Sequence, residues 1–547
     1  MKIRIWLDCV VFSLMAIGVW SGEAAAAPQE MAQGFTIAGR VVNAVTGAAV
    51  GGVVVTVADA RMPMRRVVAT TGEGGEFSFA GLPAGKFSLM GSRAGYATSD
   101  YEQHERYSTA IVTGPDFATD KLVLRLMPLA MITGHVTDEV GEGIRNAAVM
   151  LYMEDHSEGM TRVTQAGGAK TDDRGYFDIG VLQPGTYYVS ATARPWYARS
   201  GQRKAGEPSP LDVAYPTTFY GGATDSDGAS PIVLKGGDKL DIDIQLRATP
   251  ALHVMFQVPI DQPPQQGQPQ GPVFHMPVLR KREFDAASFP EGVNMQMVEP
   301  GVMELTGITP GKYEVDLRTS NSPQASEFLD VDLEHDGQSL SVAEATALGE
   351  LKITLKMPEG DPVPRQYAVL LRDAKEKVVQ GHPGDADGVV TFDAVRPGKY
   401  GIVVEMPGRL VTVGRIVSTA GETAGAQVNV PGGAKVEVTA EIVAGEVRID
   451  GVAQKNGKPV AGVMVALVPK DTTRVELFRR DQSDFDGTFS LRDVVPGTYT
   501  LVAVQDAWGF EWMKPGVLEK YVKSGKSVVV GSERGVMRVE PIEVVGR

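Results

Sequence analysis

The sequence has almost no cysteine and no excess of basic residues. Its single cysteine, Cys9, falls in an N-terminal apolar segment, so no disulfide can stabilise the rest of the chain. Acidic residues outnumber basic ones by 67 to 53, which gives a formal net charge of −14. A chain of this charge repels polyanions, so nucleic acid is not an expected partner. Its stability must come from buried apolar surface.

Long hydrophobic runs are also missing after the N-terminus, so the rest of the chain has no candidate transmembrane helix. At the N-terminus, Lys2 and Arg4 precede an apolar run, Val10–Trp20, which is followed by four alanines. This order is typical of a secretory signal peptide that is cleaved after a small residue. We expect cleavage near Ala26 and a signal peptide over residues 1–26. A membrane anchor is the alternative, but the apolar run is short for one.

Signatures of catalysis and of metal binding are absent as well. The histidines are spread along the chain, and none is followed three residues later by glutamate, as a His-x-x-Glu zinc pair requires. The sequence has no G-x-S-x-G nucleophile elbow and no Walker loop. We therefore expect a chain that is not an enzyme, with no catalytic residue, no metal site and no cofactor.

What the sequence does contain is one motif of constant length in five copies. Every copy has glycine at positions 1 and 11, an apolar residue at positions 3, 5 and 8, and phenylalanine or tyrosine at position 13. Position 10 is proline in all copies but the first. The copies are GEFSFAGLPAGKF (Gly75–Phe87), GYFDIGVLQPGTY (Gly175–Tyr187), GVMELTGITPGKY (Gly301–Tyr313), GVVTFDAVRPGKY (Gly388–Tyr400) and GTFSLRDVVPGTY (Gly487–Tyr499).

The second copy illustrates how the motif is expected to fold. Phe177 and Ile179 alternate with polar residues and therefore share one face of a β-strand. Pro184 and Gly185 suit the second and third positions of a type II turn, the third of which needs a positive φ. Tyr187 then starts a second strand and points inward, where burial of its ring contributes roughly 1.5–3 kcal/mol. The motif is a folding signature and supplies no nucleophile, metal ligand or phosphate-binding loop.

The motif copies are about a hundred residues apart, which is the size of a sandwich of roughly seven strands. The fold class is therefore all-β, a tandem array of about five Ig-like or transthyretin-like β-sandwich domains after the signal peptide. Short linkers between them predict a semi-rigid rod or a gently curved chain. The third repeat is the most degenerate, and its Pro/Gln stretch, Pro259–Pro272, is expected to be a mobile loop. The expected domains are residues 33–128, 129–248, 249–347, 348–444 and 445–547.

The repeats resemble a known family. In the second repeat GHVTDEVGEGIRNAAVMLY precedes TDDRGYFDIGVLQPGTYYVSA, and in the fifth GVAQKNGKPVAGVMVALV precedes DGTFSLRDVVPGTYTLVA. This pattern resembles the carboxypeptidase regulatory-like domain, a transthyretin-like sandwich of the carbohydrate-binding-like folds that is close to the Cna B-type repeats. The first repeat fits well, whereas the third and fourth keep little beyond the motif. The resemblance implies a fold and an accessory, spacer or binding role.

Aromatic residues gather in the loops that follow the motif. Trp196 is nine residues after Tyr187, and Trp508 is nine after Tyr499. Rings with polar neighbours such as Arg194 form the kind of flat platform on which sugars stack. The alternative is that the rings hold the loop against the sandwich as a small core. The candidate glycan-binding residues are Trp196, Tyr197, Tyr215, Tyr220, Trp508, Phe510, Trp512 and Tyr521.

Aspartates stand three residues before the motif glycine in three copies, at Asp172, Asp385 and Asp484. Spaced carboxylates suit calcium, but an EF-hand-like loop needs a bidentate glutamate downstream, and strand residues follow here. A hairpin turn in which aspartate bonds its own backbone explains the pattern better. We therefore expect no calcium site.

These features predict an exported, non-catalytic, multi-domain binding or scaffold protein of the cell envelope. Polysaccharide is the favoured ligand, on the basis of the resemblance and the loop aromatics, and envelope proteins are the other expected partners. The expected location is periplasmic, outer-membrane-associated or extracellular. The alternatives are a structural spacer or protein-interaction array without glycan binding, and an accessory subunit of a separate hydrolase. Exposed loop aromatics would favour the binding protein over the spacer.

Overall fold

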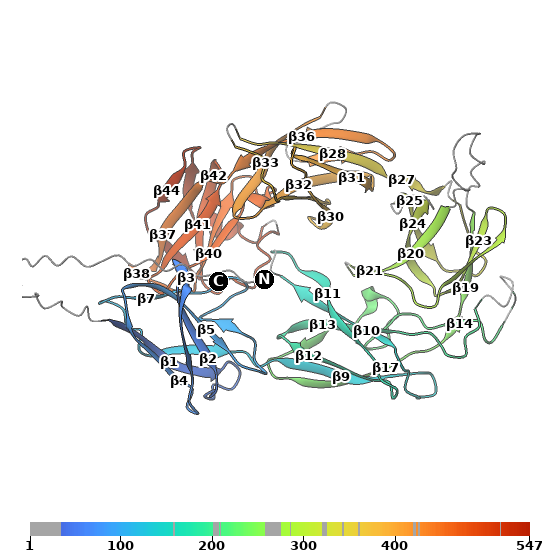
Figure 1. Ribbon diagram of the computed structural model, residues 1–547, viewed down its shortest axis with the longest axis horizontal. Helices are drawn as coiled ribbons and strands as arrows, with labels where there is room; N and C mark the ends of the chain where they lie inside the picture. The colour runs from blue at the N-terminus through green and yellow to red at the C-terminus, as the bar shows by residue number, and fades with distance from the viewer. Residues whose placement is uncertain are drawn as a thin grey trace, which may run out of the picture.

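The computed structural model is built almost entirely of β-strands, which form five successive sandwich units (Figure 1). This confirms the predicted all-β class and the tandem repeat. The predicted signal peptide and the Pro/Gln loop lie outside the described residues. The structure describes residues 34–546 apart from 157–158, 201–206, 208, 258–274, 285, 320–324, 342–343, 359–360, 419–422, 425–426 and 515.

Units one and two follow one plan. The first strand pairs antiparallel with the first motif strand and parallel with the closing strand, and a second sheet packs on this three-stranded sheet. Unit one contains β1 (Phe35–Asn43), β2 (Val54–Asp59), β3 (Met62–Thr70), β4 (Glu76–Leu82), β5 (Gly85–Ser92), β6 (Ser99–Asp100), β7 (Ile111–Thr113) and β8 (Leu122–Leu126). Unit two contains β9 (Ala130–Thr137), β10 (Ala148–Asp155), β11 (Arg162–Lys170), β12 (Tyr176–Leu182), β13 (Gly185–Thr192), β14 (Val213–Ala214), β15 (Thr218–Phe219), β16 (Ile232–Leu234) and β17 (Lys239–Gln245).

Units three and four keep the antiparallel pairing of the opening strand with the first motif strand. In unit four a long strand, β33, pairs with both sheets and joins them into one. Unit three contains β18 (Thr249–Pro250), β19 (Leu252–Gln257), β20 (His275–Glu283), β21 (Ala286–Ser288), β22 (Asn294–Glu299), β23 (Val302–Ile308), β24 (Gly311–Thr319), β25 (Ala325–Leu333), β26 (Ser339–Ser341) and β27 (Thr346–Ala347). Unit four contains β28 (Gly349–Lys356), β29 (Ala368–Arg372), β30 (Val378–Pro383), β31 (Val389–Val395), β32 (Gly398–Met406), β33 (Arg409–Ser418), β34 (Thr423–Ala424), β35 (Gln427–Val430) and β36 (Lys435–Ala444).

Unit five closes the series and carries the short helix α1 in the loop after its motif. Its opening strand, β37, pairs with both β41 and β45, so the two sheets are connected at this edge. Unit five contains β37 (Val447–Lys455), β38 (Lys458–Pro459), β39 (Met464–Pro469), β40 (Arg479–Gln482), β41 (Thr488–Val494), β42 (Gly497–Val504), α1 (Glu519–Val522), β43 (Lys526–Val530), β44 (Gly535–Arg538) and β45 (Ile542–Val545).

The motif links the two sheets of a sandwich. In unit two its first strand, β12, belongs to the β12-β9-β17 sheet, and its second, β13, belongs to the sheet in which β10 lies. Tyr187 is buried at 2% exposure, as predicted. Its hydroxyl donates to the Gln183 carbonyl over 2.7 Å, and the motif tyrosines of units three, four and five make the same bond to the residue four positions earlier. The ring therefore fixes the crossing between sheets as well as filling the core.

The turn of the second motif copy is not type II, because Gly185 does not have a positive φ. The positive φ lies earlier, at Val181 (φ 63°), where the strand forms a bulge. A Cβ built on Gly185 would lie 3.6 Å from the Tyr187 ring. This is an ordinary contact distance, so the ring does not exclude a larger residue at position 11. The prediction of a type II turn was wrong.

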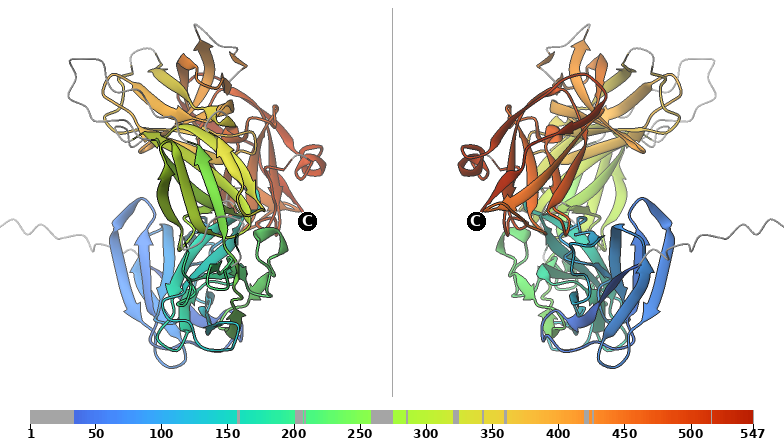
Figure 2. Two further views of the ribbon diagram at one scale, coloured as in Figure 1. Left: turned by 90° about the vertical axis from the view of Figure 1, so that its right-hand side faces the viewer. Right: turned by 90° about the vertical axis from the view of Figure 1, so that its left-hand side faces the viewer.

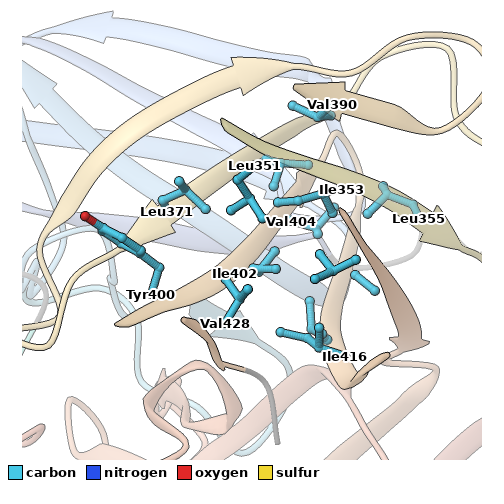
Figure 3. Close-up of a cluster of buried hydrophobic side chains, with 14 of the residues drawn as sticks. Leu351, Ile353, Leu355, Leu371, Val390, Tyr400, Ile402, Val404, Ile416 and Val428 are labelled. Atoms are coloured by element: carbon cyan, nitrogen blue, oxygen red, sulfur yellow. The ribbon is translucent and has the colours of Figure 1, made fainter. Parts of the chain in front are cut away.

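Each sandwich encloses its own apolar core. In unit four, Leu351, Ile353 and Leu371 are completely buried between the sheets, and Tyr400 closes one end of the cluster (Figure 3). Alternation along β28 places every second side chain in this core. Comparable clusters occupy the other four units, which accounts for stability without disulfides.

The five units form a closed ring, because unit five returns to contact unit one (Figure 1). Figure 2 shows the ring edge-on, with the first two units on one side and the fourth and fifth on the other. Contacts also cross the ring: Met513 N of unit five donates to the Gly159 carbonyl of unit two over 3.0 Å. The predicted rod or gently curved chain is therefore wrong. That prediction was based on the short linkers between units. Short linkers also allow a closed ring when the first and last units bind each other.

A buried histidine helps to fix the junction of units two and three. His253 Nε2 lies 2.6 Å from Asp212 Oδ2 of unit two, and its Nδ1 lies 2.6 Å from Glu304 Oε1 of unit three. All three side chains are at most 4% exposed. A buried polar cluster of this kind holds its members in one geometry, because separating them would leave charged groups without partners. The junction is therefore a fixed joint.

Candidate functional site

The contact between units one and five is the most extensive candidate site, and we call it the closing interface. It is formed by Lys86 and the segment 102–110 of unit one against the segment 480–485 of unit five. Lys86 Nζ lies 2.5 Å from Asp484 Oδ2, and Asp484 Oδ1 accepts a hydrogen bond from Ala110 N over 3.0 Å. Phe485 N donates to the Ala110 carbonyl over 3.0 Å. Backbone and charged groups thus join the two units.

Gln482 lies at the centre of the closing interface and is 2% exposed. Its amide nitrogen donates to the Glu102 carbonyl over 2.6 Å and to Thr109 Oγ1 over 2.8 Å. Its amide oxygen accepts from His104 Nδ1 over 3.0 Å. Both ends of this buried amide are therefore satisfied by unit one, which is expected of a specific interface.

Trp508, predicted as a platform residue, is covered by unit one. His104 stacks on its ring with the ring centroids 5.1 Å apart, and Tyr107 packs at 5.5 Å. Trp508 is 9% exposed, and its Nε1 donates to the Gly462 carbonyl over 3.2 Å. The ring thus belongs to the closing interface and presents no free face to a sugar.

Trp512 lies where units one, two and five meet. The Arg480 guanidinium lies 4.5 Å from its ring centroid and also donates to Glu105 Oε2 over 2.8 Å. A Cβ added at Gly159 of unit two would lie 2.4 Å from the Trp512 ring, so this glycine allows the two units to approach. Trp512 is 8% exposed and packs in a cluster with Phe478.

Trp196 contrasts with these two rings, because it is 88% exposed. Tyr197 packs edge-on against it, with centroids 5.6 Å apart, and is held by a hydrogen bond to the Glu139 carboxylate. Tyr215 donates to the other oxygen of Glu139 over 3.0 Å. Burial and the Glu139 carboxylate raise the pKa of Tyr215. The neighbour of Trp196, Tyr197, is therefore held in place by Glu139, and the Trp196 ring itself is open to solvent.

The remaining predicted aromatics pack inside their own units. Tyr215 (6% exposed) and Tyr521 (4%) are buried, whereas Tyr220 and Phe510 are half-buried against the clusters of units two and five. The structure therefore brings the eight predicted residues to two separate places, and only Trp196 among them is exposed. Trp196 and Trp508 are equally spaced from their motif tyrosines, so the sequence does not show that one is exposed and the other buried. Their exposure depends on which of the two loops unit one covers.

The acidic turns connect one sheet to the other and do not close hairpins. Asp172 Oδ1 accepts from the backbone nitrogens of Arg174 and Tyr176, at 2.9 and 2.8 Å, and these bonds lower the pKa of its carboxyl. Asp385 makes the same two bonds in unit four. In the residues that the structure describes, no group of three or more His, Cys, Asp or Glu side chains could hold a metal ion. Across the same residues no helix has the length and apolarity to cross a membrane.

Comparison with known families bears on the first, second and fifth units. A family model of the carboxypeptidase regulatory-like domain matches residues 36–112 and 131–216. The first two units are carboxypeptidase regulatory-like domains. The predicted resemblance is thereby confirmed for these regulatory-like units. Residues 442–531 match a different model, the second β-sandwich domain of BOS complex subunit NOMO1-like proteins. No curated protein is significantly similar in sequence to the chain.

The solved structures that match the chain do so at low sequence identity and low TM-scores. The Bacillus anthracis TIE protein is 11% identical over 75% of this chain and 68% of its own, with a TM-score of 0.17. A minor pilin of Streptococcus agalactiae is 11% identical over 40% of this chain and 97% of its own, with a TM-score of 0.22. The major pilin subunit of Bacillus cereus is 12% identical over 57% of this chain and 99% of its own, with a TM-score of 0.14. Such low TM-scores carry no inference about function or about the arrangement of units.

Proposed function

We propose that this protein is an exported, non-catalytic scaffold of the cell envelope whose five sandwich units act as one closed ring. The observation that carries the proposal is the closing interface, in which Gln482 is buried against unit one and Asp484 bonds both a side chain and the backbone of that unit. A ring holds its outward surfaces at fixed distances, whereas a chain with free joints does not. Fixed spacing suits a protein that positions partners.

The family of unit five agrees with a role in an assembly. Its matching model describes a domain of a complex subunit, and we extend only that role to this chain. We propose residues 1–26 as the cleaved signal peptide, and residues 33–128, 129–248, 249–347, 348–444 and 445–547 as the folding units. The proposed location is periplasmic, outer-membrane-associated or extracellular.

Small-angle X-ray scattering in solution tests the closed ring. A compact chain of this length has a radius of gyration of about 24 Å, whereas five units in line, each roughly 30 Å long, would form a rod with a radius of gyration of roughly 45 Å. We expect the compact value for the wild type and a larger maximum dimension for the double variant Gln482→Ala, Asp484→Ala. An extended wild-type particle would refute the proposal. The variant Asp385→Ala, which changes the equivalent turn of unit four, is the control and should stay compact.

Glycan binding at unit two is a second candidate function, favoured by the 88% exposure of Trp196. The flat ring, braced by Tyr197, could stack on a sugar, and Arg194 stands two residues away in the same loop. Polysaccharide pull-down with Trp196→Ala tests it. We expect retention to be lost in this variant and kept in Phe289→Ala, which removes another exposed ring (69%). Equal retention by both variants, or none by the wild type, would leave the scaffold role alone.

A further inference from the structure

A cleft of about 810 Å³ lies between units one and five, beside the closing interface. Seven of its lining side chains are basic and three are acidic, although the whole chain carries a net charge of −14. A second cleft of about 550 Å³ shares Arg106, Tyr107, Phe478 and Arg480 with it and extends towards units two and four. Basic charge is therefore concentrated at the place where the units meet.

One wall of the cleft is the outer face of two paired strands of unit five. Ile449 of β37 and Leu491 of β41 are paired and buried in the core. Because side chains alternate along a strand, the residues on either side of them face the cleft. These residues are Arg448, Asp450, Ser490 and Arg492, all of which line it.

The opposite wall comes from unit one. Arg61 stands in the turn between β2 and β3, and Arg106 and Tyr107 belong to the loop that also forms the closing interface. The Arg106 guanidinium lies 5.3 Å from the Tyr107 ring centroid. The cleft therefore exists only while units one and five are joined, and it rests on the closed ring proposed above.

Four of the basic side chains are already engaged. Lys86 pairs with Asp484 at 2.5 Å, Arg448 with Asp450 at 3.0 Å and Arg480 with Glu105 at 2.8 Å. The fourth, Arg479, donates to backbone carbonyls.

The other three, Arg61, Arg106 and Arg492, are exposed and have no carboxylate within ion-pair distance among the described residues. Two come from unit one and one from unit five, so an anion between them would be held from both walls.

We propose that this cleft binds an acidic oligosaccharide, with its carboxylate groups paired to Arg61, Arg106 and Arg492. Guanidinium groups bind carboxylates through two parallel hydrogen bonds, which makes exposed arginines suited to this contact. The cleft volume is within the usual range for sites of small ligands, about 300–1,000 Å³. The negative surface outside the cleft disfavours long polyanions, so a short ligand is selected.

The acidic and hydroxyl groups of the cleft distinguish a sugar from a phosphate compound. Asp450 and Asp481 line the cleft as hydrogen-bond acceptors. Ser490 bridges them, since its hydroxyl donates to Asp450 over 2.9 Å and its backbone nitrogen donates to Asp481 over 2.6 Å. Sugar hydroxyls can donate to these oxygens, whereas a fully ionised phosphate has no hydrogen to donate.

Isothermal titration of the whole protein with trigalacturonate tests the proposal, with maltotriose as the neutral trisaccharide and tripolyphosphate as the anion without sugar. We expect trigalacturonate to bind, maltotriose to give no signal, and the affinity to fall at about 0.5 M salt, where exposed charges are screened. Arg61→Ala and Arg492→Ala should each lower the affinity about tenfold or more, the effect of one charge-assisted hydrogen bond. Arg66→Ala removes an exposed arginine of the same hairpin outside the cleft and should bind like the wild type.

Three results would overturn the inference: no binding of trigalacturonate, unchanged affinity in Arg61→Ala and Arg492→Ala, or tighter binding of tripolyphosphate, which would show that charge alone is recognised. Scattering profiles of the same samples separate this failure from failure of the scaffold. If the wild type is a compact ring that binds no trigalacturonate, the cleft assignment fails and the closed ring stands. If the wild type is extended, the closed ring itself fails.

Discussion

Lys86 and Asp484 are separated by 398 residues in the chain, and their Nζ and Oδ2 atoms lie 2.5 Å apart. Asp484 occupies the same place before its motif glycine as Asp172 and Asp385 do in units two and four. Those two carboxylates bond the backbone of their own turns, whereas Asp484 accepts from Ala110 N of unit one. The same motif position therefore stabilises a local turn in units two and four, whereas in unit five it joins unit five to unit one.

The first prediction is an energetic coupling between Lys86 and Asp484. In a double-mutant cycle, Lys86→Ala and Asp484→Ala should show an interaction energy of about 0.5–1 kcal/mol, because the pair is partly exposed and screened by water. Urea unfolding, followed by the fluorescence of Trp508 and Trp512, measures the stability of unit five. Purely additive effects would mean that the ion pair between Lys86 and Asp484 does not form in solution.

The second prediction separates the tryptophans by burial. Trp512→Ala should lower the free energy of unfolding of unit five by about 3–5 kcal/mol, because the ring is 8% exposed and its removal leaves a cavity. Trp196→Ala should change stability by less than about 0.5 kcal/mol, as surface substitutions do. Thermal unfolding of both variants measures the difference. A large stability loss for Trp196→Ala would contradict its placement at the surface.

The third prediction concerns the hydrogen bond of the motif tyrosine. Tyr187→Phe keeps the ring and removes the bond to the Gln183 carbonyl, so unit two should lose about 1 kcal/mol. Phe87 occupies the same position in unit one without a hydroxyl, and Phe87→Leu, which alters only the ring, is the matched test of packing. Chemical denaturation measures both. If Tyr187→Phe left the free energy of unfolding unchanged, the hydroxyl would contribute nothing and the motif residue would stabilise unit two through its ring alone.

The buried positions of the motif could be read from the sequence because they depend on local alternation. Phe177 and Tyr187 were predicted to be buried, and both are. The turn type could not be read correctly, because the positive φ lies at Val181, a β-branched residue that rarely adopts it, and not at Gly185. A Pro-Gly pair looks the same in sequence whether or not its glycine has a positive φ.

The ring and the fate of the loop aromatics could not be predicted for a different reason. Trp196 and Trp508 stand at the same distance from their motif tyrosines, yet one is 88% and the other 9% exposed. The difference is made by His104 and Tyr107, which come from a unit some four repeats away in the chain. Contacts of this kind follow no periodicity, so composition and spacing within one repeat contain no signal for them.

The last prediction is a pH dependence that originates at Asp481, in the wall of the basic cleft. Burial raises the pKa of this carboxyl to about 6, although it accepts hydrogen bonds from Ser490 N and Gln482 N. In the unfolded chain an aspartate titrates near 3.9. Between about pH 4 and pH 6 the native state therefore holds a proton that the unfolded state releases. Because the native state binds more protons, the free energy of unfolding falls as the pH rises through this window, by on the order of 3 kcal/mol in total.

Asp481→Asn removes this titration while it keeps the shape of the side chain. We subtract the free energy of unfolding of the wild type from that of the variant at each pH. This difference should be about 2–3 kcal/mol more positive at pH 7.5 than at pH 4.5, because only the wild type loses stability as the pH rises. Urea unfolding of both proteins at the two pH values, followed by the fluorescence of Trp508 and Trp512, measures the difference. The asparagine does not titrate, so any effect of the substitution that is independent of pH cancels in the comparison. A difference in stability between the two proteins that does not change with pH would show that Asp481 has an ordinary pKa and is well solvated, and that the cleft is more open to water than its walls indicate.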